Sequence, residues 1–435
     1  MLSMIGLLLG LALLIVLTMR GVELLIAAPL CALLVALTSG FELFPQLAAA
    51  GSPSFTGAYM TGFTSFVTSW FFMFLLGSLF GKFMEASGAA ESVARWIVEH
   101  LGTGSAIFAV VLACAVLTYG GVSLFVVAFS VYPMALSLFR AAEMPRRFVP
   151  CAIAFGSVTF TMTAAGSPEI QNWIPIQYLG TSPWAGWQVS LVVALAMAAL
   201  GSLWLRFMLR RAVASGERFI ARSDDPKVDS RALPHPFTSL LPLVAVLGLS
   251  FAFHDSLKES ALIIALIGGI VVSLLIHRRY MAGMREPVAS GALGALIAIA
   301  NTAAVVGFGG VARLAPAFQQ AVDLITQVPG PPLVGAAIAV TLIAGLTGSA
   351  SGGQAIALPI VAPHYLALGV GPEALHRVVA LSSGALDSLP HNGYVVTTIR
   401  AICRETYQEA YPAVAALTVI VPALGAALAV LLFSL

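Results

Sequence analysis

Apolar runs long enough to cross a membrane make up most of this sequence. A helix needs ~20 apolar residues to cross the ~30 Å hydrocarbon core of a bilayer. Such runs lie near 4–20, 22–38, 61–85, 145–172, 184–208, 236–253, 258–276, 287–315, 372–400 and 411–434. Hydrophobic residues account for 59% of the 435 residues and charged residues for 9%, whereas a soluble domain carries about 25% charged residues. We therefore predict an all-α polytopic membrane protein.

Two further apolar regions, 103–140 and 331–370, are interrupted near their middles by "TYGGVS" (118–123) and "TGSASGGQ" (347–354). Basic residues are concentrated in the stretches 206–231 and 278–285, which predicts that both stretches are cytoplasmic. This sidedness is consistent along the chain only if both interrupted regions enter and leave the membrane on one face, as re-entrant hairpins. Both termini then lie on the outer side of the inner (plasma) membrane. The isolated exceptions to the charge pattern are Lys258, Arg313 and Arg377.

The two halves of the chain resemble each other at an offset of about 230 residues. The matching pairs of segments are 77–88 with 307–318, 117–123 with 346–353, and 131–147 with 361–377. We therefore predict two repeats, 1–230 and 231–435, each with five spans and one hairpin; the cytoplasmic loop 209–235 joins them. Because five is odd, the second repeat is inverted. Inverted repeats with broken helices at corresponding positions indicate a secondary transporter and its binding site.

The candidate site lies where these helices are broken. Beside the two hairpin tips, the segments 156–172 and 382–392 carry the helix breakers Gly166, Pro168, Gly384 and Pro390. Broken helices free backbone N–H groups, which suit an anion, and carbonyls, which suit a cation. The predicted substrate-binding residues are Thr118, Gly120, Gly121, Ser123, Asn172, Thr347, Gly348, Ser349, Ser351, Gly352 and Asn392.

Asp387, His391 and Glu169 are the candidates for carrying a coupling proton. A carboxylate at membrane depth costs ~2.5–3.5 kcal/mol, so it is a functional candidate by default. A desolvated aspartate has a raised pKa, and a histidine titrates near neutral pH, so the pair could carry a coupling proton. The alternative is structural, with Asp387 capping the second half-helix and His391 bonding to a carbonyl. We expect Arg377 to begin a span and no arginine to lie deep in the membrane, which favours a singly charged anion held by N–H groups and neutral side chains.

Two short segments, 89–102 and 317–330, have amphipathic helical periodicity. Each one directly precedes a hairpin. We expect both to be interfacial helices that lie flat on opposite faces of the membrane.

The motifs "GALDSLPHNG" (384–393), "GKFMEASGAAESVARWIVEHLG" (81–102) and "AAGSPEIQN" (164–172) resemble the gluconate:proton symporter (GntP) family over about 60–410. This resemblance implies proton-driven transport of a sugar acid, hydroxybutyrate or D-serine. It also implies a homodimer that works by an elevator mechanism. A scaffold would come from 4–85 and 236–315, and a moving transport body from 103–208 and 331–434. The first tip, "TYGGVS", is bulkier than the second, which leaves the substrate class open.

Other functions fit the sequence less well. A channel would need a carbonyl filter or a ring of charges, and an intramembrane metalloprotease would need H-E-x-x-H; neither is present. An intramembrane serine protease would give the repeat no role. The close alternative is a sodium-coupled carboxylate carrier, in which the freed carbonyls bind the cation. We therefore expect no enzyme, cofactor, metal or nucleic-acid partner, but a small organic anion carried across the lipid bilayer with protons.

Overall fold

The structure is a computed structural model that describes residues 2–20, 22–49, 51–101, 105–223, 225, 232–318, 320, 331–390 and 392–435. The regular elements within these residues are helices, and one isolated bridge pairs Glu42 with Ser54. In the first half they are α1 (Leu2–Met19), α2 (Leu24–Thr38), α3 (Phe55–Ala86), α4 (Ala89–Leu101), α5 (Ala106–Tyr119), α6 (Leu124–Ala141), η2 (Arg146–Phe148), α7 (Val149–Ala154), η3 (Phe155–Thr159), η4 (Ile170–Asn172), α8 (Ile176–Leu179) and α9 (Trp187–Ala214). In the second half they are α10 (Pro236–Leu257), η5 (Lys258–Ser260), α11 (Ala261–His277), η6 (Arg278–Tyr280), α12 (Arg285–Leu314), α14 (Pro332–Thr347), α15 (Ala350–Ala367), α16 (Pro372–Ser383), α17 (Gly393–Val396), η7 (Thr397–Ile402), α18 (Tyr407–Ala415), η8 (Ala416–Ile420) and α19 (Val421–Ser434).

Seven helices in the described part of the chain are long and apolar enough to cross a membrane. They are α3, α6, α9, α10, α11 continued through η6, α12, and the run from α18 to α19. The helices α1, α2, α5 and α14 are apolar but shorter. The prediction of an all-helical, multi-span membrane protein is therefore confirmed.

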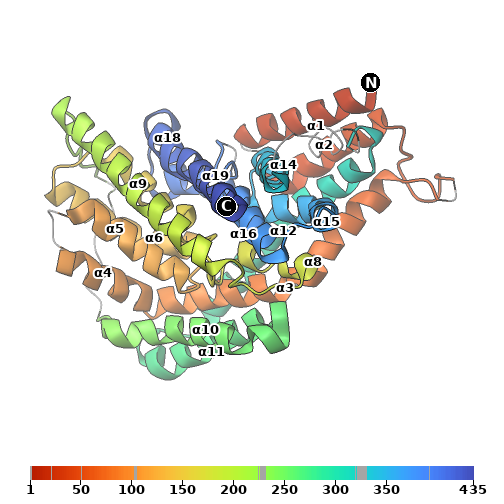
Figure 1. The fold of residues 1–435 in the computed structure, drawn as a ribbon. Helices are drawn as coiled ribbons and strands as arrows, with labels where there is room; N and C mark the ends of the chain where they lie inside the picture. The colour runs from red at the N-terminus through yellow and green to blue at the C-terminus, as the bar shows by residue number, and fades with distance from the viewer. Residues whose placement is uncertain are drawn as a thin grey trace.

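The long helices α3 and α12 pack against each other along their length (Figure 1). Small residues make this close approach possible, as is common between membrane helices. A Cβ atom added to Gly62 would lie 2.6 Å from the carbonyl oxygen of Val306, and one added to Gly310 would lie 2.7 Å from that of Ala58. In Figure 1, α1 and α2 lie at one edge of the molecule and α10 and α11 at the opposite edge, with α3 and α12 between them.

Both regions expected to form hairpins are helix pairs with a short break. Helix α5 ends at Tyr119 and α6 begins at Leu124, and Gly121 between them has a φ of 89°. Helix α14 ends at Thr347 and α15 begins at Ala350. Gly348 has a φ of 60°, a left-handed conformation that favours glycine. The breaks lie where the glycine-rich stretches predicted them.

The runs 145–172 and 372–400 are helical only in part. In the first, α7 passes into a π-helical turn that ends at Thr159, and 160–169 is irregular. In the second, α16 ends at Ser383 and the next helix begins at Gly393. Gly384 caps the end of α16 in the second run, whereas Gly166 and Pro168 lie in the irregular stretch that follows the helix in the first. Further π-helical turns occur in η7 and η8, and such turns are frequent at functional sites.

The amphipathic segment 89–102 forms helix α4 as predicted, through Leu101. Its apolar face, including Val93 and Ile97, is buried. The second such segment, 317–330, lies almost entirely outside the described residues.

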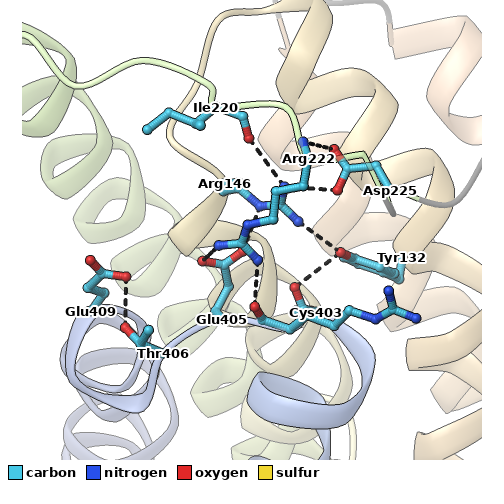
Figure 2. A network of polar contacts seen from close by, with 10 residues as sticks. Tyr132, Arg146, Ile220, Arg222, Asp225, Cys403, Glu405, Thr406 and Glu409 are labelled. Carbon is cyan, nitrogen blue, oxygen red and sulfur yellow. Dashed lines mark hydrogen bonds and ion pairs between the residues drawn. The ribbon is translucent and has the colours of Figure 1, made fainter.

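A buried network of charges joins three connecting segments (Figure 2). The Arg146 Nε atom lies 2.7 Å from Glu405, and its Nη1 atom lies 2.9 Å from Asp225. Arg222 reaches the second carboxylate oxygen of Glu405 at 3.2 Å. Nearby, Arg147 pairs with Glu217 at 2.7 Å and lowers the pKa of that carboxyl group. The segment after α9 is thereby fixed to the start of α7 and to the connection before α18.

Candidate functional site

The first hairpin tip and the first broken segment lie against each other. The Tyr119 hydroxyl donates a hydrogen bond to the Ala165 carbonyl at 2.7 Å. A Cβ atom on Gly121 would lie 3.4 Å from the ring of Pro168. On its other side this tip packs on α10 and α3, because Gly120 faces Leu243 and Ser123 faces Gly81. Thr118 is fully buried just before the break.

The second tip and the second broken segment are joined in the same way. The Asn392 side-chain amide donates to the carbonyl of Gly348 at 3.1 Å. The Thr341 hydroxyl of α14 donates to the Ser382 carbonyl at 3.0 Å. At the tip itself, Ser349 accepts a hydrogen bond from the backbone N–H of Gly352 and lies 3.4 Å from the Ser351 hydroxyl. Thr347 hydrogen-bonds to neighbouring carbonyls of the same tip.

Contacts between the halves bring all four interrupted segments into one region. The Gln354 side-chain amide donates to the Gln171 carbonyl at 3.1 Å and to the Ser383 hydroxyl at 2.9 Å. A Cβ atom on Gly384 would lie 3.3 Å from the methyl group of Thr163. On the side of the first tip, the Phe125 and Tyr394 rings pack edge to face, with centroids 5.6 Å apart. The sequence predicted each break separately, and the structure places them together.

Arg377 lies in the first half of α16, near the start of a span as we expected. Its side chain is fully buried (0% exposed) and contacts the other half of the chain, which the sequence did not predict. The guanidinium donates to the carbonyls of Ala185, Thr163 and Pro183 at 2.7–3.0 Å. It also donates to the side-chain oxygen of Asn172 at 2.7 Å. These acceptors are neutral, and Arg377 makes no ion pair with any residue that the structure describes.

The two predicted asparagines hold the broken segments in shape. Asn172 accepts from Arg377 and donates to the carbonyls of Met162 and Ser167. Asn392 caps α17 by accepting from the Val395 N–H at 2.9 Å. Its amide also donates to the Asp387 carbonyl at 2.9 Å. Every polar group of both side chains is thus engaged with protein.

The helix breakers shape the backbone around these asparagines. Gly166 has a φ of 79° and donates its N–H to the Pro183 carbonyl at 3.0 Å. The carbonyl of Pro390 accepts from the Tyr407 hydroxyl at 2.8 Å. Both breaks are therefore stabilised by hydrogen bonds from outside their own helix, which replace those that a continuous helix would make.

The candidate proton carriers differ in their surroundings. Asp387 is 6% exposed and accepts a hydrogen bond from the Ser388 hydroxyl at 3.0 Å. Glu169 is half-buried, and its carboxylate has no hydrogen-bond or ion-pair partner in the described part of the chain. His391 lies outside the described residues. Within those residues, no group of three or more His, Cys, Asp and Glu side chains is placed to hold a metal ion.

The matched family model, described as GntP family permease, covers residues 2–432. The chain belongs to the GntP permease family. The uncharacterized transporter YxjC of Bacillus subtilis (strain 168) is 36% identical over 465 aligned positions, which cover 96% of each chain. The D-serine transporter DsdX of Escherichia coli (strain K12) is 24% identical over 363 positions, covering 77% of this chain and 78% of DsdX.

A solved structure shares the fold. The YdaH transporter of Alcanivorax borkumensis aligns with a TM-score of 0.59 and 16% identity, over 94% of this chain and 97% of YdaH. The family model and the similarity to YxjC confirm the resemblance to the GntP family. This GntP permease is therefore a secondary transporter of a small solute, not an enzyme.

Several buried polar atoms near the breaks of this GntP permease have no partner among the described residues. They are the side-chain oxygens of Thr118, Gln171, Gln354 and Ser382. A buried polar atom without a partner requires an explanation such as water or a ligand. The sequence identified Thr118 but not the other three, nor Arg377. The available signal was an amide beside each break, in "EIQN" and "SGGQ".

Proposed function

We propose that this permease is a proton-coupled symporter of a small hydroxy-monocarboxylate, such as a gluconate-like sugar acid or hydroxybutyrate. The observation that carries the proposal is the buried guanidinium of Arg377, which is hydrogen-bonded only to neutral acceptors. A buried charge without a counter-charge is costly, and one bound carboxylate nearby would reduce that cost.

Neutral groups near the breaks supply the remaining recognition. The amide oxygens of Gln171 and Gln354 and the hydroxyl of Ser382 have no partner among the described residues, and they suit the hydroxyl groups of such an acid. Together with the backbone groups freed at the breaks, they favour a singly charged, hydroxylated molecule over a tricarboxylate. D-serine, the substrate named for DsdX, has the same carboxylate and hydroxyl groups with an added ammonium group.

We further propose that the chain consists of two inverted repeats and works as an elevator in a homodimer. The long helices α3 and α12 begin at Phe55 and Arg285, an offset of 285 − 55 = 230 residues. Each is followed, further along the chain, by a helix pair with a glycine break and then by a broken helix. Helices α1, α2, α3, α10, α11 and α12 would form the scaffold, and the other long helices the moving body.

The ion-pair network supports the proposed sidedness. Arg222 and Glu217 lie in the stretch 206–231, which we expect on the cytoplasmic side. Arg222 is joined to Arg146 through Glu405, and Glu217 pairs with Arg147. Arg222 also donates to the Arg404 carbonyl. With these residues together on the cytoplasmic face, both termini of the chain lie on the outer face of the membrane.

Uptake into proteoliposomes tests the proposal. The panel comprises gluconate, glycerate, lactate, 3-hydroxybutyrate, D-serine and citrate, each under an imposed proton gradient and separately under a sodium gradient. We expect proton-driven accumulation of a hydroxy-monocarboxylate and none of citrate. Uptake driven only by sodium would overturn the coupling ion and favour a sodium-coupled carrier. Transport of none of the monocarboxylates would overturn the substrate class.

A further inference from the structure

A cavity lies outside the broken segments but close to them. It has a volume of about 400 Å³ and is lined by α3, α12, α8 and α15, and by Pro45 and residues 52–54. Its lining includes Thr61, Ser65, Tyr178, Arg313 and Ile356. We refer to it as the Arg313 cavity. Its walls come from both parts of the proposed elevator: α3 and α12 belong to the scaffold, whereas α8 and α15 belong to the moving body.

Arg313 is the one charged side chain among the residues that line this cavity. It makes no ion pair or hydrogen bond with any residue that the structure describes. It is also one of the isolated basic residues that depart from the sidedness of charge along the chain, so orientation in the membrane does not account for it.

The other polar groups of the cavity leave few donors free. Thr61 and Ser65 use their hydroxyl hydrogens within their own helix, on the carbonyls of Gly57 and Gly62 at 2.8 and 2.9 Å. The side-chain donors that remain are the Arg313 guanidinium and the hydroxyl groups of Tyr178, Ser52 and Ser54, of which only the guanidinium is charged. A cation and a phenol that meet in one cavity, without an acid, suit a carboxylate.

The cavity adjoins the candidate site. Ala355 and Ile356 line it and directly follow Gln354, whose amide binds the Gln171 carbonyl. Tyr178 lies in α8, which follows shortly after Asn172 and contacts both α15 and α16. The Arg313 cavity and the candidate site therefore share α15, and α8 links the two.

We propose that the Arg313 cavity is an outer vestibule in which the carboxylate of the substrate binds first, between Arg313 and Tyr178. The inference rests on the proposed transport of an organic anion. A charge in a cleft with low-dielectric walls concentrates oppositely charged ligands and raises their association rate. Arg313 thereby acts on substrate capture, whereas the broken segments act on tight binding and coupling.

The local potential can be measured without knowing the substrate. In Thr61→Cys protein, we add a negatively charged or a positively charged methanethiosulfonate reagent of similar size from the outside. We then compare the rates at which the two reagents label the cysteine. The native cysteines are buried, and the parent protein gives the background. We expect the anionic-to-cationic rate ratio to fall by roughly tenfold in Arg313→Gln and to be retained in Arg313→Lys. At 1 M salt, where the Debye length is about 3 Å, the variants should converge.

Lys258→Gln is the matched control, because Lys258 is also an isolated cation but does not line the cavity. We expect this change to leave the ratio unaltered. An unchanged ratio in Arg313→Gln, or an equal fall in Lys258→Gln, would overturn the vestibule.

Uptake measurements separate this inference from the proposed substrate. For a transported monocarboxylate, Arg313→Gln should raise KM by roughly tenfold at low salt and leave the maximal rate unchanged. A KM that is unchanged at low salt would overturn the role in capture. If no monocarboxylate is transported while the labelling ratio still depends on Arg313, the anion-attracting cavity is retained and only the substrate class fails.

Discussion

At the scale of single residues, the Arg377 guanidinium lies between the two halves of the site, and its hydrogen-bond acceptors are all neutral. An arginine side chain has five N–H donors, and the carbonyls of Ala185, Thr163 and Pro183 and the Asn172 oxygen accept four hydrogen bonds from it. The residue therefore has two effects: it fixes the irregular segment 163–186 in place, and it adds a positive charge to the site.

Replacing Arg377 separates these effects. Arg377→Gln leaves buried carbonyls without donors, at about 1–3 kcal/mol for each unsatisfied group, so we expect a lower melting temperature and no uptake. Arg377→Lys keeps the charge but cannot reach all the acceptors, and should fold with uptake reduced at least tenfold. Thermal unfolding in detergent and uptake in proteoliposomes check both. Arg20→Gln, at an exposed position, is the control; equal losses in this variant would contradict the role of Arg377.

Asp387 gives the second prediction at this scale. Its carboxylate is 6% exposed and is bonded to Ser388. Asp387→Asn preserves the size of the side chain but removes the carboxylate that binds and releases the coupling proton. We expect gradient-driven accumulation to be lost while substrate exchange across the membrane persists. Exchange and accumulation are measured on the same vesicles. Glu169→Gln makes the same acid-to-amide change at the other candidate proton carrier that the structure describes, for comparison. Accumulation at the wild-type level in Asp387→Asn would exclude the proton role.

The positions of the breaks were predictable from sequence, and their partners were not. Each break depends on the backbone conformation of the glycines and prolines in it, at 121 and 348 and around 166 and 384. A local sequence pattern therefore identifies these positions. Arg377 binds carbonyls that lie up to 214 residues away in the chain, and no local pattern specifies such a pairing. Gln171 and Gln354 were missed for the same reason, because their role depends on a contact between the two halves.

At the scale of elements, the polar network of Figure 2 fixes connecting segments rather than helices. Glu405 lies before α18, Arg146 at the start of the broken helix of the other half, and Arg222 after α9. The Glu405 side chain is 3% exposed, so its charge depends on both arginines. A buried pair of this kind is costly to break, because the remaining partner keeps an uncompensated charge.

Glu405→Gln should therefore destabilise the folded protein by about 3–5 kcal/mol. The control is Glu217→Gln, which removes the pair with Arg147, in which the carboxylate is 38% exposed; exposed pairs contribute only ~0–1 kcal/mol. Reversible unfolding in detergent and denaturant measures both variants. Equal effects would mean that the network contributes no more than a surface pair.

At the scale of the whole molecule, the proposed scaffold and body meet at several separate places. Helix α3 touches α6 where Gly81 faces Val126, and a Cβ atom on Gly81 would lie 3.1 Å from a methyl group of that valine. Helix α12 touches α15, and α10 packs on the first tip, where Leu243 faces Gly120. Within the scaffold, by contrast, α3 and α12 pack along their length. This difference is what sliding of one body against the other requires.

A disulfide between Gly81→Cys and Val126→Cys tests that sliding. If α6 moves relative to α3 in each transport cycle, the oxidised protein should lose uptake and a reductant should restore it. The control pair, Val246→Cys with Gly269→Cys, joins α10 to α11 within the scaffold, where a Cβ atom added at Gly269 would meet the Val246 side chain. It should leave uptake unchanged when oxidised. Full uptake by the cross-linked Gly81–Val126 variant would show that these helices do not separate during transport. In that case the substrate must reach the broken segments by local opening of the tips, and the division into scaffold and moving body would be wrong.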